Sequence, residues 1–411
     1  MKACVFTLGC KVNEVESESL MRGLEELGYE TTEELCPADV YILNTCAVTA
    51  EAEKKSRQAV ARVRKFNPAA PVYVCGCASQ NNPEAFSARE GVVYVSGTRK
   101  KDDILSLLSG GGKGEDDGGF CEMPPPKRTK TRSFLRIQDG CNNFCSYCLI
   151  PYLRGRSCSR GAEEIVREAR ALCEEGAKEI VLTGIDISSY RDGENDLAAL
   201  LSMLGDVPAR VRLGSLEVGV VTERFLSAAK EAGNFAPHFH LSLQSGSTAV
   251  LKKMNRHYTR EEYLSRCALI RSYFSDAAIT TDIIAGFPTE TEEDFEDSLS
   301  IIREAGFAHV HAFAFSARAG TVAAKWKDLP PEVKKERVAR LIQAAQEQEE
   351  RFLARFEGRE AEVLFEEDGG YTANYIRVYA AGAREGSLCR VRLGKREKDG
   401  LHADILEEII S

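Results

Sequence analysis

Residues 139–156, DGCNNFCSYCLIPYLRGR, decide how the rest of the chain is interpreted. Cys141, Cys145 and Cys148 stand at C-x3-C-x2-C spacing, and the aromatic residue Tyr147 precedes the last of them. A structural zinc site closes four ligands, usually from two cysteine pairs or from Cys and His. Iron–sulfur clusters are also held by thiolates, usually four, so three thiolates leave one iron open to another ligand. The count of three favours such a cluster over a zinc knuckle or a coincidence among 14 cysteines.

The composition places the chain among multidomain proteins of a reducing compartment. It has 411 residues and a formal net charge of −9, and this length allows roughly two to four domains. No apolar run approaches the roughly 18–20 residues of a membrane span, and the N-terminus has no signal-peptide pattern. We therefore expect a cytoplasmic protein with no membrane contact, in which cysteines serve metal or catalytic chemistry. The acidic total argues against broad nucleic-acid affinity but allows a local basic patch.

Alternating apolar runs and helical segments predict an α/β fold. The first series spans residues 1–108 and predicts a parallel sheet, because helices connect successive strands. Its expected strands are 2–8, 40–45, 72–75 and 92–95, and its expected helices are 13–28, 49–66 and 82–89. Residues 109–132 are rich in Gly, Pro and charge, a composition typical of linkers.

A second strand–helix series occupies 133–356 and ends in a long charged helix. Six units predict a partial (βα)6 barrel rather than a complete barrel of eight. The expected strands are 133–137, 179–183, 210–214, 238–243, 278–284 and 309–315. The tail 357–411 has short alternating segments separated by turns, which predict a small antiparallel β-barrel.

Polar residues alternate along several strands of the second series. Parallel strands that are buried on both faces usually have continuous apolar runs, so one shared polar face indicates a lumen that holds a ligand. An ordinary hydrogen-bonded polar core is the alternative, and we assign no histidine to a metal. The alternating residues are His238, His240, Ser242, Gln244, Thr280, Asp282, His309 and His311.

A second set of cysteines follows strands of the first series. Cys10, Cys46, and either Cys75 or Cys77 each end a predicted strand. Parallel strands share a carboxyl edge, so these thiols can converge on one site. Buried free cysteine is the alternative, and it explains loop cysteines beside Gly or Asn poorly.

The motif C-x3-C-x-aromatic-C after the first strand of a βα series resembles that of the radical S-adenosylmethionine (SAM) enzymes. The resemblance implies that the open iron binds the amino and carboxylate groups of SAM, which is then cleaved to a 5′-deoxyadenosyl radical. The resemblance also places residues of four further motifs at SAM, namely LTGID, SLE, LQSGS and DIIAGFPTET. Tyr147, beside the cluster, is expected to pack against the nucleoside of SAM. These cofactor residues are Tyr147, Gly184, Glu217, Gln244 and Asp282.

The pattern GC-x-x-N…NTCAV…GC-x-S-Q, upstream of the radical SAM motif, resembles the methylthiotransferases over essentially the whole chain. This resemblance implies two [4Fe–4S] clusters, with Cys10, Cys46 and Cys77 holding the auxiliary one, and a C-terminal TRAM barrel. Cys75 is an extra thiol that we expect on the same strand face as Cys77. Cys158 in RGRSCSR also departs from the family pattern, which has a charged residue there.

GCKVN, IQDGCNNFC and HAFAFSARAGT are most similar to the branch that acts on N6-threonylcarbamoyladenosine of tRNA. The resemblance implies SCH3 insertion at C2 of the adenosine 3′ of the anticodon, with one SAM for the methyl group and a second for the radical. It further implies a reductant such as flavodoxin or ferredoxin, and a monomer. The alternatives are the isopentenyladenosine branch and the branch that modifies an aspartate of a ribosomal protein.

Aromatic and basic residues predict where tRNA binds, because small barrels hold nucleic acid by stacking and basic grooves. The candidates are Tyr371, Tyr375 and Arg377 in the tail, and Arg154 and Arg156 after the central cysteines. The alternative from another class is a non-catalytic RNA-binding protein with zinc at both cysteine sets. A fourth converging ligand at either set would favour zinc.

Overall fold

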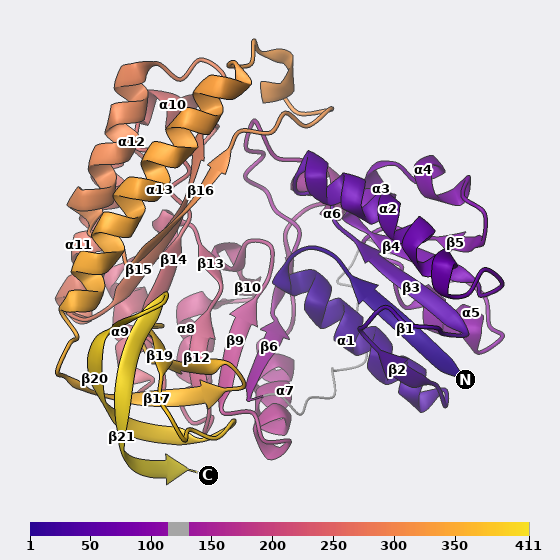
Figure 1. Ribbon diagram of the computed structural model, residues 1–411, viewed down its shortest axis with the longest axis horizontal. Coiled ribbons are helices and arrows are strands. Elements are labelled where there is room, and N and C mark those ends of the chain that lie inside the picture. The colour runs from indigo at the N-terminus through magenta and orange to yellow at the C-terminus, as the bar shows by residue number, and fades with distance from the viewer. Residues whose placement is uncertain (114–130, 411) are drawn as a thin grey trace.

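A computed structural model describes residues 1–113 and 131–410 of the chain. It contains an N-terminal α/β domain, a central α/β domain and a C-terminal barrel, which follow one another in the sequence (Figure 1). Most of the predicted linker 109–132 lies outside the described residues.

The N-terminal domain is a parallel five-stranded sheet of order β2-β1-β3-β4-β5. The four predicted strands are confirmed, whereas β2 was missed because its three residues ETT form no apolar run. The strands are β1 (Lys2–Thr7), β2 (Glu30–Thr32), β3 (Val40–Thr45), β4 (Val72–Gly76) and β5 (Val92–Val95). The helices are α1 (Lys11–Glu26), α2 (Ala50–Phe66), α3 (Cys77–Asn81), α4 (Glu84–Ser87) and α5 (Asp103–Leu108).

The central domain contains two parallel sheets, of order β12-β9-β6 and β13-β14-β15-β16, linked by a single bridge between Val211 and Phe235. All six predicted strands are present, although the fourth ends at Leu241. The strands of the first sheet are β6 (Arg132–Arg136), β9 (Glu179–Thr183) and β12 (Arg210–Leu213). Those of the second are β13 (Ser215–Leu216), β14 (His238–Leu241), β15 (Ala278–Ala285) and β16 (His309–Ala314).

Amphipathic helices cover the convex side of these sheets. In α7 the buried residues Ala162, Ile165, Ala169 and Leu172 recur at helical spacing and join the main apolar core. The helices are α6 (Ile150–Arg154), α7 (Ala162–Glu174), α8 (Leu197–Met203), α9 (Glu223–Glu231), α10 (Thr248–Lys253), α11 (Arg260–Tyr273), α12 (Glu292–Ala305) and α13 (Pro331–Ala354). Two small hairpin-like pairs are β7 (Gln138–Asp139) with β8 (Cys158–Ser159), and β10 (Arg191–Asp192) with β11 (Asn195–Asp196). In the described part of the chain, no helix is both long and apolar enough to cross a membrane.

The C-terminal strands close into a barrel of order β17-β18-β19-β21-β20. The expectation of a wholly antiparallel barrel is wrong for one pair, because β21 runs parallel to β19. The reason is that β20 and β21 form an antiparallel hairpin, and β21 then closes the barrel against β19. The strands are β17 (Glu360–Glu366), β18 (Gly369–Thr372), β19 (Arg377–Tyr379), β20 (Leu388–Glu397) and β21 (Gly400–Ile410).

A buried charge network joins the N-terminal and central domains. Glu16 of α1 is 1% exposed, and its carboxylate accepts hydrogen bonds from Arg154 and Arg136 at 3.0 Å and from Lys101. Arg154 also donates to Asp139 at 3.0 Å. Burial alone would raise the pKa of Glu16, but these cations hold it well below its usual range.

A second buried network docks the C-terminal barrel on the central domain. Glu179, fully buried at the start of β9, accepts hydrogen bonds from Arg212 at 2.7 and 2.8 Å and pairs with Arg132 at 2.8 Å. Arg212 in turn donates to the backbone oxygen of Ala373 at 3.0 Å. Arg210 donates to the backbone oxygen of Tyr371 at 3.3 Å. The barrel therefore binds at the amino ends of the central strands.

Replacing this buried carboxylate will destabilise the chain. We expect Glu179→Gln to lower the free energy of unfolding at pH 7 by about 3–5 kcal/mol, because it leaves buried guanidinium groups unpaired. Burial alone would raise the pKa of Glu179, but Arg212 and its neighbours lower it from 4.5 to about 2. The carboxylate therefore stabilises the wild type above pH 4.5, and the difference between the two proteins will shrink as the pH falls toward 2.

Urea unfolding of both proteins over this pH range measures the effect. The matched control is Glu360→Gln, because Glu360 pairs with Arg392 at 3.0 Å on the surface and should cost less than about 1 kcal/mol. Equal unfolding midpoints for the Glu179 and Glu360 variants would contradict a structural role of the buried network.

Candidate functional site

Three thiols of the N-terminal domain meet at one edge of its sheet. The strand register pairs Thr7 with Asn44 and Thr45 with Gly76, so the chain leaves β1, β3 and β4 at the same edge. The residues that follow carry the cysteines, and all three line one cavity of about 980 Å³. These cysteines are Cys10, Cys46 and Cys77.

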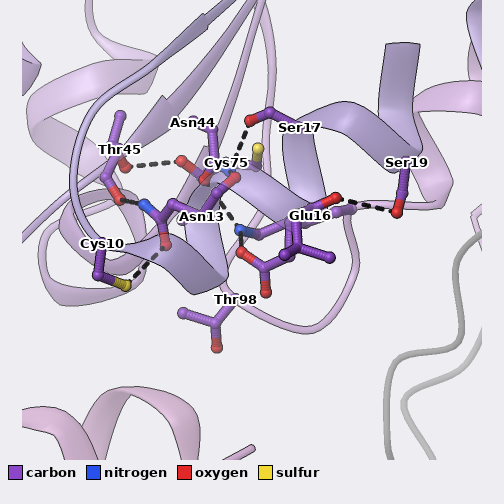
Figure 2. Close-up of polar contacts among 12 residues, drawn as sticks. Cys10, Asn13, Glu16, Ser17, Ser19, Asn44, Thr45, Cys75 and Thr98 are labelled. Carbon is purple, nitrogen blue, oxygen red and sulfur yellow. Dashed lines mark hydrogen bonds and ion pairs between the residues drawn. The ribbon is translucent and has the colours of Figure 1, made fainter. Parts of the chain in front are cut away.

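Asn13 connects these loops, and its role was not predicted from the sequence. Its side-chain amide donates to the backbone oxygens of Leu8 at 2.7 Å and Thr45 at 3.1 Å. Its Oδ1 accepts a hydrogen bond from Arg154 at 2.9 Å and lies 3.9 Å from the Cys10 sulfur (Figure 2). Asn13 thereby fixes the Cys10 loop to the end of β3 and to the central domain. The GC-x-x-N motif was the available signal.

Cys75 and Cys77 do not share a face, so that expectation is wrong. Gly76, with φ +106°, turns the chain between them, and a Cβ there would lie 2.4 Å from the Thr45 oxygen. Cys75 is fully buried in the apolar cluster beneath α1, with Leu20 and Ile104, and Cys77 begins α3 beside the cavity. Figure 2 shows the Cys10 and Cys75 sulfurs on opposite sides of Asn13 and Asn44, which are joined by one hydrogen bond.

The three central thiols each accept an N–H group. The backbone amide of Asn143 lies 3.4 Å from the Cys141 sulfur, and that of Ile150 lies 3.4 Å from the Cys148 sulfur. The guanidinium of Arg256 lies 3.5 Å from the Cys145 sulfur. Such donors stabilise a thiolate, which is the form that ligates iron.

Arg256 also connects the central thiols to Glu217. Its Nη2 donates to Glu217 Oε2 at 2.7 Å, and both residues line a second cavity of about 260 Å³. Burial raises the pKa of Glu217, and Arg256 opposes this. Asp186, after β9, lies 3.9 Å from the Cys141 sulfur. Arg256 and Asp186 were not predicted: Arg256 lies in no cysteine or glycine motif, and in LTGID only Gly184 was singled out, although Asp186 ends the same motif.

The thiols of the two sets are not drawn together as closely as the ligands of one zinc ion. Zn–S bonds of about 2.3 Å in a tetrahedron place sulfurs about 3.8 Å apart. Among the described residues, the one set of three potential ligand atoms within 4.8 Å of one another is His240, Asp282 and His311, so neither cysteine set has zinc spacing. Burial raises the pKa of Cys46 and Cys141 to about 11. These thiols therefore need a bound cation to ionise at neutral pH, and the donor sets fit iron–sulfur clusters.

The predicted polar face lines the large cavity. His238, His240, Thr280, Asp282, His309 and His311 all line it, which confirms the alternation along β14, β15 and β16. Ser242 and Gln244 lie beyond the end of β14. His240 Nε2 lies 3.3 Å from Asp282 Oδ2, and its Nδ1 lies 3.0 Å from the Thr280 hydroxyl. His240, Asp282 and His311, which were predicted to share this polar face, bring their ligand atoms within 4.8 Å of one another.

The remaining predicted cofactor residues surround the carboxyl ends of the strands. Gly184 lines the large cavity, and a Cβ there would lie 2.8 Å from the backbone oxygen of Gln138. The backbone of Gly184 therefore lies close to that of Gln138, a residue shortly before the central cysteine loop. Gln244 has φ +71°, and its backbone N–H donates to the backbone oxygen of Asp282 at 2.8 Å. Tyr147 is half-buried and lies edge-on to Phe287 at 6.4 Å.

The predicted RNA residues lie in three different environments. Arg154 is 2% exposed and its guanidinium is bound by Glu16, Asp139 and Asn13. The expectation that it contacts RNA is therefore wrong. Arg156 is exposed, with its guanidinium 4.8 Å from the centre of the Phe144 ring.

The predicted tail residues line the large cavity and also dock the barrel. Tyr375 stacks with Tyr371 at 4.7 Å and with His238 of β14 at 4.6 Å. The guanidinium of Arg212 lies 4.6 Å from the Tyr375 ring centre. Arg377 pairs with Asp399 at 3.0 Å. These three predicted residues and Asp399 line the same cavity as Cys10, Cys46 and Cys77.

Two family models match the chain. The Radical SAM superfamily matches residues 135–302, and the uncharacterized protein family UPF0004 matches residues 2–97. Among solved structures, the radical S-adenosylmethionine methyltransferase TsrM from Kitasatospora setae has a TM-score of 0.57 at 15% identity, over 79% of this chain and 77% of that one. This likeness shows a shared fold.

Curated relatives match over nearly the full length. The Bacillus subtilis threonylcarbamoyladenosine tRNA methylthiotransferase MtaB is 35% identical over 98% of this chain and 97% of its own. The Aquifex aeolicus protein of the same name is 36% identical over 95% and 100%. The Staphylococcus haemolyticus tRNA-2-methylthio-N(6)-dimethylallyladenosine synthase is 35% identical over 98% and 84%. The chain belongs to the radical SAM methylthiotransferase family and resembles its MtaB branch.

Proposed function

We propose that this protein adds SCH3 to C2 of N6-threonylcarbamoyladenosine, 3′ of the anticodon of tRNA. The observation that carries the proposal is the shared cavity of about 980 Å³. The N-terminal thiols, the polar face of the central sheets and the tyrosines of the C-terminal barrel all line it. A volume at the upper end of the usual range for ligand sites suits a nucleoside that is turned out of its strand.

The finer fold and the domain boundaries belong to this proposal. We assign 1–108 to the auxiliary-cluster domain, 109–132 to a linker, 133–356 to a (βα)6 radical SAM barrel with α13, and 357–411 to a TRAM-like barrel. The closed order of β17–β21 and the parallel strands of the central sheets support this division.

The cofactors that fit are two [4Fe–4S] clusters and SAM. The clusters would supply the electron that cleaves SAM and the site from which sulfur is transferred. Cys141, Cys145 and Cys148 would hold one cluster and keep an iron open, and the N–H donors at their sulfurs would stabilise the thiolates. Cys10, Cys46 and Cys77 would hold the other at the wall of the cavity.

Several residues would orient SAM between the central thiols and the cavity. Glu217 is held by Arg256, which also contacts Cys145, so a ligand in the smaller cavity meets a fixed carboxylate. Gly184 and Asp282 line the larger cavity. The proposed set also includes Gln244, which lies between β14 and β15, and Tyr147, which lies in the central cysteine loop.

The tRNA would be held by residues at the mouth and floor of the cavity. Arg156 is exposed, and no carboxylate of the described residues forms an ion pair with its guanidinium. This guanidinium is therefore suited to a phosphate contact. The exposed parts of Tyr371 and Tyr375 would contact the nucleoside, and Arg377 would lie beside it. Arg154 is excluded from this set by its burial.

Partners and location follow from the proposed reaction. A flavodoxin or ferredoxin would supply electrons, the chain would act as a monomer, and a tRNA substrate would require it to work in the cytoplasm. The dimethylallyladenosine branch remains the second candidate, because the Staphylococcus haemolyticus relative is as similar in identity as MtaB of Bacillus subtilis. The zinc-stabilised alternative is disfavoured by the spacing of both thiol sets.

The substrate can be tested on tRNA nucleosides. We expect cells that lack this chain to accumulate N6-threonylcarbamoyladenosine without its 2-methylthio derivative, and the wild-type chain to restore that derivative. Cys148→Ala, which removes one central ligand, should restore nothing at equal protein level. Mass spectrometry of digested tRNA measures both nucleosides. Loss of 2-methylthio-dimethylallyladenosine instead would assign the chain to the second candidate.

Cys77 and Cys75 can be separated by iron content. Two clusters correspond to about eight irons per chain. We expect Cys77→Ala to reduce this to about four, because its thiol faces the cavity, and Cys75→Ala to keep about eight, because Cys75 is buried beneath α1. Iron and sulfide determination on anaerobically purified protein measures the difference.

Circular dichroism and chromatographic size of both variants serve as the folding control. If the Cys75 variant lost as much iron as a well-folded Cys77 variant, the assignment of Cys77 as the third thiol would be wrong.

A further inference from the structure

Lys11 places an uncompensated cation in the large cavity. It is the first residue of α1 and directly follows Cys10, and its exposed side chain lines the cavity. Its ammonium lies 5.6 Å from the centre of the Phe134 ring, which directs it toward the central sheet. Within residues 1–113 and 131–410, no carboxylate lies within 4.0 Å of this ammonium.

Of the four carboxylates that line the cavity, three contact other side chains, and the fourth, Glu14, lies three residues after Lys11 on α1. Asp282 contacts His240 at 3.3 Å, and Glu349 contacts His309 at 2.9 Å. Asp399 pairs with Arg377 at 3.0 Å. None of these four carboxylates lies within 4.0 Å of the Lys11 ammonium.

The lining of the large cavity carries slightly more positive than negative charge. Its Lys and Arg residues are five, namely Lys11, Arg132, Arg154, Arg212 and Arg377, and its Asp and Glu residues are four, namely Glu14, Asp282, Glu349 and Asp399. This cavity favours an anionic ligand.

We propose that Lys11 binds the carboxylate of the threonylcarbamoyl group and so selects adenosine with an anionic N6 substituent. This inference rests on the proposed function and names the residue that distinguishes its two candidate substrates. A dimethylallyl group has no charge, so it would leave the ammonium partly desolvated and unpaired, which is unfavourable.

The geometry of adenine favours the substituent over a phosphate as the anion. C2 and N6 both lie on the Watson–Crick edge of the base, and the ribose phosphate lies on the far side. The proposed sulfur-transfer site is formed by Cys10 and its two partner thiols, so a base that presents C2 to it also turns N6 toward the same wall. Lys11, next to Cys10, is then within reach of the carboxylate, which lies a few bonds beyond N6.

The test uses anticodon stem-loop RNAs that differ only in the N6 substituent. One carries threonylcarbamoyladenosine, one the corresponding carboxamide and one dimethylallyladenosine. The reconstituted wild type, Lys11→Met and Lys11→Arg are compared by RNA binding in fluorescence anisotropy and by kcat/KM for methylthiolation. Lys65→Met, an exposed lysine of α2 away from the cavity, is the matched control.

We expect Lys11→Met to weaken binding and kcat/KM about 10- to 100-fold on the carboxylate RNA, the range of a charge-assisted hydrogen bond. It should change the carboxamide RNA less than about twofold, and Lys11→Arg should retain most of the selectivity. Equal losses on both RNAs would show a phosphate contact or a structural role, and no loss would show no contact; either overturns the inference. A wild type that prefers the dimethylallyl RNA would overturn the proposed function itself.

Discussion

The buried ion pair between Glu16 and Arg154 fixes the two thiol sites relative to each other. Glu16 lies on α1, which begins directly after Cys10, and Arg154 ends α6, which begins soon after Cys148. The pair thus joins the two helices that continue from the two cysteine sets. Burying charges is costly unless each is paired and hydrogen-bonded, and here Arg154 meets this condition through Glu16, Asp139 and Asn13. The same interaction that stabilises the interface therefore sets its geometry.

This constraint explains why the large cavity belongs to no single domain. The N-terminal thiols, the polar residues of β14–β16, and Tyr371 and Tyr375 of the barrel all line it. The Glu179 network brings those tyrosines to the central sheet through Arg210 and Arg212. Two buried carboxylates, each surrounded by guanidinium groups, therefore assemble the cavity from opposite sides. A substrate base placed there would lie beside the N-terminal thiols and the polar face of the central sheet.

The sequence predicted most strands and the composition of each thiol set, because apolar runs and cysteine spacing are local signals. It failed where the deciding partner is distant in the chain. Arg154 belongs to the basic stretch YLRGR, and its carboxylate partner Glu16 is 138 residues away. Tyr375 suggested an open stacking surface, but His238 of another domain occupies it in part. Cys75 and Cys77 were placed on one face because the strand was taken to continue, whereas the positive φ of Gly76 ends it.

In the proposed function, the cluster held by the central thiols would cleave SAM, and the N-terminal thiols would hold the cluster that handles sulfur. Formation of 5′-deoxyadenosine from SAM under reducing conditions tests it most directly, in a variant with Cys10, Cys46 and Cys77 all changed to Ala. We expect this variant, shown to be folded by circular dichroism and chromatographic size, still to form 5′-deoxyadenosine but no methylthiolated nucleoside. The matching variant of Cys141, Cys145 and Cys148 should form neither product. A folded N-terminal variant that cleaves no SAM would contradict the division of labour between the two sites.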